Sequence, residues 1–560
     1  MGHEEPGGPV YDGELTENAQ RAPMKAVHHT LALAVKSLAV AIPFLFAYTR
    51  SPMTNFWPLI ASAMCGWLIV VLCITRVDRP AALRQELAQC LRWGLILAGA
   101  LASVVGLIQF FLGDVGMSPW IYPSALGQAI GNLRQRNQQA TLILMSALAL
   151  LLWLPALLAP QEHERRHRYE GLRSAAVVLL PWVLALLAMG SGATASRTGA
   201  VEWVALVLLL WLWRASVGKL ALAMGVAGLL AYLLAAWALP ELLLRWTGVQ
   251  MDGLFMRVAD TSHRCTSRLT LWSNMLYLIE LKPWLGWGWG ELDYAHYSTI
   301  FPGERFCLLL DNAHNLPLHL AVELGVPVAI GFCALVAWAT WRGKPWRETE
   351  PARQLAWGVL AFIGMHSMLE FPLWYGPFQL AVVLAVTILL LPRRDVQVRL
   401  QTVLRVRVFL LAACCAWLAG VFIVSHDFLR MSQLYVEPPQ RIAKWRDLTA
   451  REVSESPDFF TDQAEFAWLT TASINERNAV QMHAMARRML HYSPEPRVIT
   501  KLIESAQLLG FQAEVDEQLE LLRIAYPDAY AHFKARRDGA ASAASTALAA
   551  SAASADVRRP

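Results

Sequence analysis

Repeated apolar runs of similar length dominate this sequence and restrict what it can fold into. An apolar stretch of about 20 residues can cross the hydrocarbon core of a bilayer as a helix. A helix suits that environment because it satisfies its own backbone hydrogen bonds. Since 56% of the 560 residues are hydrophobic and only 16% are charged, we expect an all-α polytopic membrane protein. About eleven spans are predicted, near residues 31–48, 55–75, 92–112, 139–159, 174–190, 199–213, 220–239, 318–341, 354–370, 373–391 and 408–425.

The distribution of Lys and Arg between these spans predicts the orientation of the chain. Short loops on one side carry most of these residues, for example Arg165, Arg166, Arg168 and Arg173 in a single loop. The positive-inside rule then places the N-terminus in the cytoplasm. The first 30 residues lack an apolar core that ends in a cleavage site, so we expect the first span itself to direct insertion.

This orientation places two long segments on the non-cytoplasmic side, which is the periplasm if the membrane is a bacterial inner membrane. They are the loop 240–317 and the region after residue 425. The second has helical periodicity that resembles the paired helices of tetratricopeptide arrays, without a clean repeat. The predicted domains are a cytoplasmic segment at 1–30, a transmembrane domain at 31–425, a helical periplasmic domain at 426–536 and a disordered Ala/Ser tail at 537–560.

Two of the eight cysteines, Cys265 and Cys307, lie in the long outside loop. In an oxidising compartment they could form a disulfide, and the sequence equally allows two free thiols. No Cys/His spacing in the chain is typical of a metal site. We therefore expect neither a metal nor another cofactor, and we expect the partners of the chain to include membrane lipid and no nucleic acid.

Several polar side chains lie where the charge bias predicts none. Arg134 and Arg136 precede the fourth span, Arg197 lies in the turn before the sixth, and Arg268 and His314 lie in the long loop. Such groups at the ends of spans often mark a substrate path. There are simpler explanations: one of the first two arginines could reach lipid phosphates, and Arg197 could bind helix-end carbonyls.

The chemistry of these side chains indicates a reaction. A guanidinium group binds phosphate with two parallel hydrogen bonds and stays charged at any working pH. A neutral imidazole can accept a proton from a hydroxyl, because the ordinary pKa of histidine is about 6.5. Arginines that hold a diphosphate and a histidine that activates an alcohol describe glycosyl transfer from a lipid-linked diphosphate sugar. On the eighth span, we interpret His319 as a packed residue, and Glu323 could pair with an arginine or cap a polar face.

Six motifs follow one another in an order that resembles a known family. They are "GNLRQRNQQAT", "ASRTG", "RLTLW", "KPWLGWGWGEL", "DNAHNLPLHLAVELGVP" and "HSMLEFPLWYGPF". Together they resemble the landmarks of the bacterial O-antigen ligase superfamily. The first and the last resemble the branch that glycosylates pilin-type proteins, the protein O-oligosaccharyltransferases. The resemblance covers most of residues 110–430.

This resemblance implies a GT-C-like helical bundle in the inner membrane, with its active site on the periplasmic face. It implies a glycan donor linked to undecaprenyl diphosphate, and as acceptor a Ser or Thr hydroxyl of a pilin or another periplasmic protein. Arg197 and Arg268 would neutralise the diphosphate, and His314 would activate the acceptor hydroxyl. Arg136 stands where the family pattern leads us to expect a smaller residue or proline. The implied supporting residues are Asn315, Gln135, Arg136, Asn137, His366, Glu370 and Tyr375.

Two other functions remain open at this stage. The same donor chemistry would serve the ligation of O-antigen to lipid A-core, or the polymerisation of repeat units. A transporter of lipid-linked glycans could also line its path with arginines. A transporter is expected to contain internal repeats or broken helices in matching halves, and we find none in the sequence.

Overall fold

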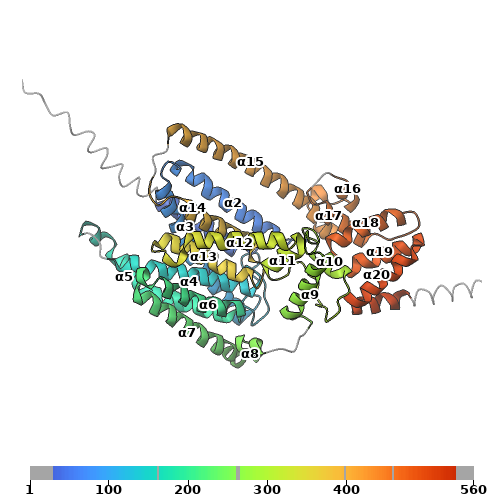
Figure 1. Cartoon of the computed structure of the whole chain (residues 1–560), viewed down its shortest axis with the longest axis horizontal. Coiled ribbons are helices and arrows are strands. Elements are labelled where there is room, and N and C mark those ends of the chain that lie inside the picture. The colour runs from blue at the N-terminus through green and yellow to red at the C-terminus, as the bar shows by residue number, and fades with distance from the viewer. Residues whose placement is uncertain (1–29, 160–162, 260–264, 396–398, 457–458, 538–560) are drawn as a thin grey trace, which may run out of the picture. The chain divides into compact units, whose positions relative to one another are not determined.

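The computed structural model describes residues 30–159, 163–259, 265–395, 399–456 and 459–537 (Figure 1). These residues form helices and turns and no β-strand, and every predicted apolar run falls on a helix. The predicted N-terminal segment up to residue 29 and the Ala/Ser tail from residue 538 lie outside the described residues. Among the described residues, seven helices are long and apolar enough to cross a membrane, and they fall at Phe56–Arg76, Pro80–Leu112, Arg136–Leu158, Ser174–Ala193, Arg214–Thr247, Val326–Arg347 and Leu400–Tyr435.

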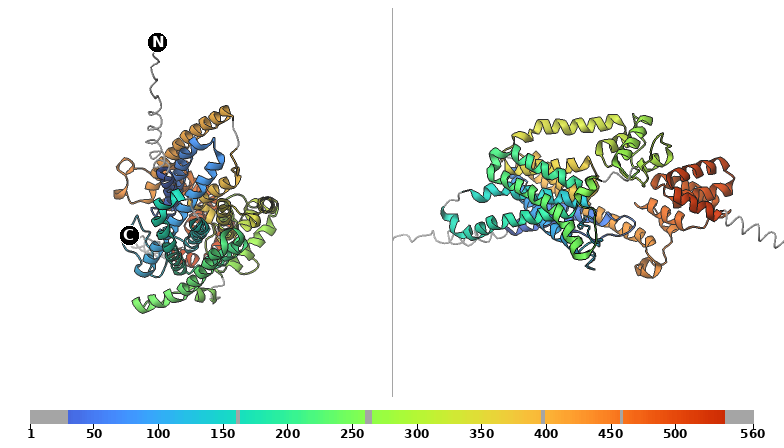
Figure 2. Two further views of the ribbon diagram at one scale, coloured as in Figure 1. Left: turned by 90° about the vertical axis from the view of Figure 1, so that its left-hand side faces the viewer. Right: turned by 90° about the horizontal axis from the view of Figure 1, so that it is seen from below.

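The chain divides into two compact units, and the first comprises Met1–Ala259, Gly343–Ser367 and Pro372–Val421. Its helices run side by side around α4 (Figures 1 and 2). α4 is buried over most of its length, which suits a helix that is apolar on all sides. The elements of this unit are a helix at Thr30–Leu45, α2 (Phe56–Cys73), η1 (Ile74–Arg76), α3 (Pro80–Leu112), α4 (Arg136–Leu158), α5 (His163–Ala193), α6 (Arg197–Leu212), α7 (Arg214–Thr247), α8 (Leu254–Ala259), η2 (Pro345–Arg347), α13 (Pro351–Ser367), η3 (Pro372–Trp374) and α14 (Gly376–Leu390).

Small residues let these helices approach closely. A Cβ atom built on Gly99 of α3 would lie 2.0 Å from Oγ of Ser146 in α4, and one on Gly190 of α5 would lie 2.5 Å from the side chain of Ser103 in α3. Close backbone contact of this kind is how membrane helices associate without a hydrophobic driving force between them. It positions the ends of α4 and its neighbours, where the candidate residues lie.

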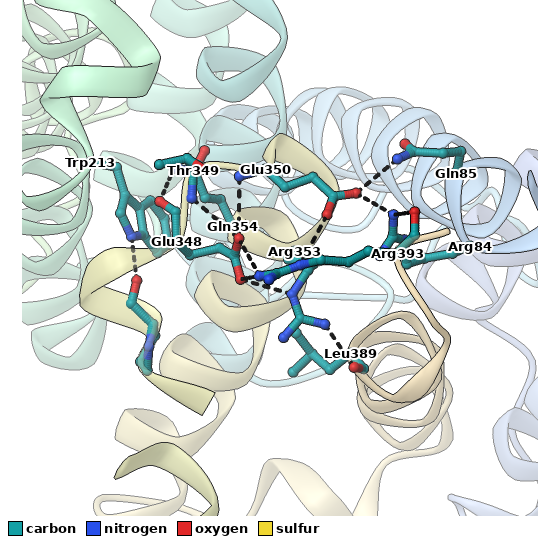
Figure 3. Close-up of polar contacts among 11 residues, drawn as sticks. Arg84, Gln85, Trp213, Glu348, Thr349, Glu350, Arg353, Gln354, Leu389 and Arg393 are labelled. Carbon is teal, nitrogen blue, oxygen red and sulfur yellow. Dashed lines mark hydrogen bonds and ion pairs between the residues drawn. The ribbon is translucent and has the colours of Figure 1, made fainter. Parts of the chain in front are cut away.

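Ion pairs connect parts of the first unit at the end where α13 begins (Figure 3). Glu348 pairs with Arg353 at 2.8 Å and with Arg393 at 3.0 Å, and Glu350 pairs with Arg84 at 2.8 Å. The carboxylate of Glu348 is buried, with 3% of its side chain exposed. Because these residues come from α3, from the segment before α13 and from the segment after α14, the network joins three parts of the unit.

The second unit comprises Asp260–Arg342, Met368–Phe371 and Phe422–Pro560. Tyr297 of α10 packs into the hydrophobic core of the C-terminal helices and donates a 2.8 Å hydrogen bond to Oε1 of Gln518. α10 is therefore part of that core. The elements are α9 (Arg268–Leu281), α10 (Leu292–Ser298), α11 (Leu316–Leu324), α12 (Val326–Gly343), η4 (Gln433–Tyr435), η5 (Pro438–Gln440), η6 (Ala443–Trp445), α16 (Ala450–Ser454), α17 (Thr461–Thr471), α18 (Ala479–Tyr492), α19 (Pro496–Leu509) and α20 (Gln512–Ala525), while α15 (Leu400–Ser432) runs from the first unit into the second.

The predicted eighth span differs from the structure. We expected one continuous helix near 318–341, but the chain breaks at Gly325, where φ is +88°, and forms α11 and α12. The glycine-rich loop before α10 packs against the chain at this break. The backbone N–H groups of Trp287 and Gly288 donate to the carbonyls of Val322 and Glu323, at 2.8 and 3.0 Å, so they cap the end of α11.

Candidate functional site

The arginines singled out in the sequence begin helices. Arg136, Arg197 and Arg268 are the first residues of α4, α6 and α9. A positive charge at a helix N-terminus opposes the helix dipole, whereas an anion there is stabilised by the dipole and by free backbone N–H groups. The position of these arginines is therefore suited to an anionic ligand. In each helix the preceding residue is an N-cap whose side chain accepts a hydrogen bond from the third backbone N–H, and these caps are Gln135, Ser196 and Ser267.

Strained backbone precedes three of the candidate helices. Arg134, Ala195 and His314 have φ values of +63°, +48° and +50°, and each stands immediately before the N-cap of α4, α6 or α11. A left-handed conformation at a non-glycine residue costs about 1–3 kcal/mol and is concentrated at functional sites. In His314 the backbone N–H donates to Oδ1 of Asn312 at 2.7 Å, which stabilises the turn.

In the first unit, the start of α4 lies beside the start of α6. Oγ of Ser196 donates to Oδ1 of Asn137 at 2.6 Å, and Nη1 of Arg257 donates to the carbonyl of Ala195 at 3.0 Å. The side chain of Arg197 is exposed and that of Arg136 is partly buried. Arg257 therefore joins Arg136 and Arg197 at this end of the unit. Arg257 is not among the residues predicted from the sequence, although it is an arginine in the long outside loop and runs against the same charge bias.

A buried polar cluster lies further along α4. Oγ1 of Thr141 is 2.7 Å from Oε1 of Glu202 and 2.8 Å from Nδ1 of His366, and all three side chains are inaccessible to solvent. The cluster links α4, α6 and α13. His366 was predicted as a supporting residue, whereas Thr141 and Glu202 were missed. Glu202 carries a recognisable signal, because an ionisable residue inside an apolar span usually has a function.

In the second unit, three side chains from distant parts of the chain meet. Nδ1 of His314 is 2.8 Å from Oε2 of Glu370, and the guanidinium of Arg268 forms an ion pair with Oε1 of the same carboxylate. Nε1 of Trp272 donates to the carbonyl of Ala313 at 3.2 Å, so α9 also holds the backbone next to His314. The disulfide between Cys265 and Cys307, with a Cα–Cα distance of 5.4 Å, closes the loop that contains α9 and α10.

This arrangement determines what His314 can do. A carboxylate only accepts hydrogen bonds, so Nδ1 carries the proton that points at Glu370. Nε2 is then the acceptor nitrogen, and none of the described residues donates a hydrogen bond to it. A histidine oriented by a carboxylate on one nitrogen and open on the other is the arrangement of a general base acting on a hydroxyl.

Three family models match consecutive parts of the chain. The model described as protein glycosylation ligase matches residues 129–154, the model described as O-antigen ligase matches 182–333, and the model described as virulence factor membrane-bound polymerase, C-terminal, matches 354–538. The first includes the start of α4, the second includes Arg197, Arg268 and His314, and the third includes Glu370. Over these three segments the chain is similar to the protein glycosylation ligase, O-antigen ligase and membrane-bound polymerase families.

One relative of this chain is the general O-oligosaccharyltransferase of Acinetobacter baylyi (strain ATCC 33305 / BD413 / ADP1). It is 32% identical over 117 residues, which are 20% of this chain and 20% of the relative. The alignment thus spans a fifth of the relative's length. The match to a membrane-bound family and the seven long apolar helices among the described residues agree that this is a multi-pass membrane protein.

The remaining residues predicted from the sequence have local partners. Nδ2 of Asn315 donates to the carbonyl of Met368 at 3.1 Å, and Oδ1 of Asn315 caps α11. Glu323 lies 3.5 Å from Nε2 of His319 and accepts hydrogen bonds from the backbone of Gly290 and Leu292, so it stabilises the loop before α10. Tyr375 packs on the core of the first unit and precedes α14. Among the described residues, no group of three or more His, Cys, Asp or Glu side chains forms a candidate metal site.

Proposed function

We propose that this protein is a glycosyltransferase that transfers a glycan from an undecaprenyl-diphosphate carrier to Ser or Thr hydroxyls of pilin-like or other periplasmic proteins. The contact of His314 with Glu370, and of Glu370 with Arg268, is the observation that carries this proposal. It brings together a base for the acceptor and a cation for the donor. The name of one matched family, protein glycosylation ligase, supports a protein acceptor.

In the proposed reaction, the acceptor oxygen attacks the anomeric carbon of the donor sugar. The bond between that carbon and the phosphate oxygen breaks, and undecaprenyl diphosphate leaves with the bonding electrons. The acceptor proton passes to Nε2 of His314, and the configuration at the anomeric carbon is inverted. A general base typically contributes about 10²–10⁴-fold to the rate.

Arg268 and Arg197 would neutralise the charge that develops on the leaving diphosphate. Guanidinium groups are suited to this because each can form two parallel hydrogen bonds with phosphate oxygens. Arg136 and Arg257 extend the cationic surface at the start of α4 and α6. In this proposal the chain has about eleven spans in a GT-C-like arrangement. The starts of α4 and α6, which carry Arg136 and Arg197, face the periplasm.

A second candidate function is the polymerisation of O-antigen repeat units or their ligation to lipid A-core. The match of residues 354–538 to a membrane-bound polymerase favours it, since that segment includes Glu370 and the C-terminal helices. The donor chemistry is the same in all three reactions, and only the acceptor differs.

The experiment combines the purified protein with an undecaprenyl-diphosphate-linked glycan and, in separate reactions, a pilin, lipid A-core and no added acceptor. We expect the glycan on a pilin Ser or Thr, located by mass spectrometry, and His314→Ala should reduce transfer at least 100-fold. His532→Ala is the matched control, because His532 is an exposed histidine of the second unit. Transfer to lipid A-core or to the donor itself would favour the second function, and full activity of His314→Ala would exclude His314 as the base.

A further inference from the structure

Glu370 lies between the two groups to which the proposed mechanism gives separate tasks. Its Oε1 atom is paired with Arg268 and its Oε2 atom is 2.8 Å from Nδ1 of His314. The side chain of Glu370 is 8% exposed, whereas those of Arg268 and His314 are each 27% exposed. The carboxylate is therefore less accessible than the guanidinium and the imidazole, which remain reachable by a ligand.

The segment that carries Glu370 is held in place by contacts on both sides. Nδ2 of Asn315 donates to the carbonyl of Met368 at 3.1 Å, and the ring of Phe371 meets the ring of His314 edge-on at 5.2 Å. Asn315 is also the N-cap of α11. The position of the carboxylate relative to the imidazole thus depends on backbone contacts as well as on the side chains.

A guanidinium and an imidazole share the single negative charge of Glu370. While Arg268 is paired with Oε1, it neutralises part of the field that the carboxylate exerts on His314. A diphosphate carries more negative charge and more acceptor oxygens than a carboxylate, so it is the stronger partner for a guanidinium. A diphosphate that reached Arg268 would compete with Glu370 for it.

We propose that Glu370 is a positioning residue for His314 and that it exchanges Arg268 with the donor diphosphate. This inference rests on the proposed function. Without donor, Arg268 holds Glu370, and His314 is a weaker base. With the diphosphate on Arg268, the full charge of Glu370 stabilises the imidazolium that forms when the acceptor proton reaches Nε2. Donor binding thereby strengthens the base, and the acceptor is activated only after the donor has bound.

The test is Glu370→Gln, which keeps a hydrogen-bond acceptor for Nδ1 and removes the charge. We expect kcat for glycan transfer to fall about 100-fold or more, as when a group that orients a catalytic side chain is lost. We also expect undecaprenyl diphosphate alone to bind about 3- to 10-fold more tightly, because its competitor for Arg268 is gone. The acid limb of the pH–rate profile should move to lower pH, since the imidazolium loses its counter-ion.

Glu280→Gln is the matched control, because Glu280 is an exposed carboxylate on α9. It should leave kcat, undecaprenyl diphosphate binding and the pH profile unchanged. If Glu370→Gln lowers transfer and weakens undecaprenyl diphosphate binding with an unchanged pH profile, Glu370 is merely structural and the proposal is wrong. A wild-type protein that neither binds undecaprenyl diphosphate nor transfers a glycan would instead overturn the proposed function.

Discussion

The two ends of the first unit use arginine in different ways. At the end where α13 begins, Arg353, Arg393 and Arg84 are paired with the carboxylates of Glu348 and Glu350 (Figure 3). At the end where α4 and α6 begin, the described residues place no carboxylate within ion-pair distance of Arg136 or Arg197. At the first end each of these arginines has a carboxylate partner, whereas at the second end Asp252 attracts Arg136 from beyond ion-pair distance.

This difference indicates different roles for the two groups. When one partner of a buried ion pair is removed, the other charge is left without compensation in a low-dielectric environment. An arginine at a helix N-terminus, where the dipole opposes it, gains most from an external anion. We therefore expect substitutions at the α13 end to change stability and substitutions at the α4 end to change transfer.

The largest expected effect is that of Arg197→Ala on transfer. Removing one preorganised cation or hydrogen-bond donor from a charged transition state typically costs about 10²–10³-fold in kcat. Because Arg197 is exposed and begins its helix, the melting temperature in detergent should stay within about 2 °C of wild type. Arg214→Ala is the control, because Arg214 is an exposed arginine that begins α7 just after the opposite end of α6, and its transfer rate should be unchanged. Wild-type transfer by Arg197→Ala would remove the distinction between the two ends.

Glu348→Ala should have the opposite phenotype. It leaves Arg353 without its carboxylate partner, and breaking a buried pair costs about 3–5 kcal/mol of the free energy of unfolding. Burial raises the pKa of Glu348, but the hydrogen bond and charge of Arg353 outweigh it and lower the pKa below the ordinary 4.5. The stability from this pair is therefore present above pH 4.5 and is lost as the pH falls further.

The measurement for Glu348→Ala is thermal unfolding of the detergent-solubilised protein at pH 7 and at pH 4, with transfer assayed well below the melting temperature. The melting temperature should drop at pH 7, and the difference from wild type should shrink at pH 4. A Glu348→Ala protein that melts like wild type but has lost transfer would place the α13 end in the catalytic machinery.

Much of the helical architecture could be predicted from the sequence because hydropathy reports it directly. Each apolar run became a helix, and the arginines at the starts of α4 and α6 were recognised because they contradict the charge bias. The break at Gly325 could not be read in this way, since it depends on a loop some 40 residues earlier that supplies N–H groups to the end of α11.

The pairing of His314 with Glu370 could not be predicted from the sequence, for a related reason. The two residues are 56 positions apart, and nothing local says that the segment after α13 belongs with α11. Glu370 was identified only through a family resemblance, without a role. Thr141 could not be recognised because a single threonine inside an apolar run has no distinguishing pattern. Its contacts are with Glu202 and His366, which come from two other helices.

The smallest expected effect concerns a carboxylate that lacks the compensation found around Glu348. Asp293 lies in the second unit beside a small cavity that His296, Arg305 and Tyr526 also line. Burial raises the pKa of Asp293 from 3.8 to about 7, and the backbone N–H of Tyr294 opposes that shift only in part. Because the folded protein holds this proton more tightly than the unfolded chain does, stability falls as the pH rises from about 4 to about 7 and then levels off.

Asp293→Asn removes the cost of ionisation, so it should raise the melting temperature at pH 8 and leave it nearly unchanged at pH 4, with the exposed Asp528→Asn as control. An equal effect of Asp293→Asn at both pH values would mean that Asp293 ionises at its ordinary pH and that its charge is compensated after all.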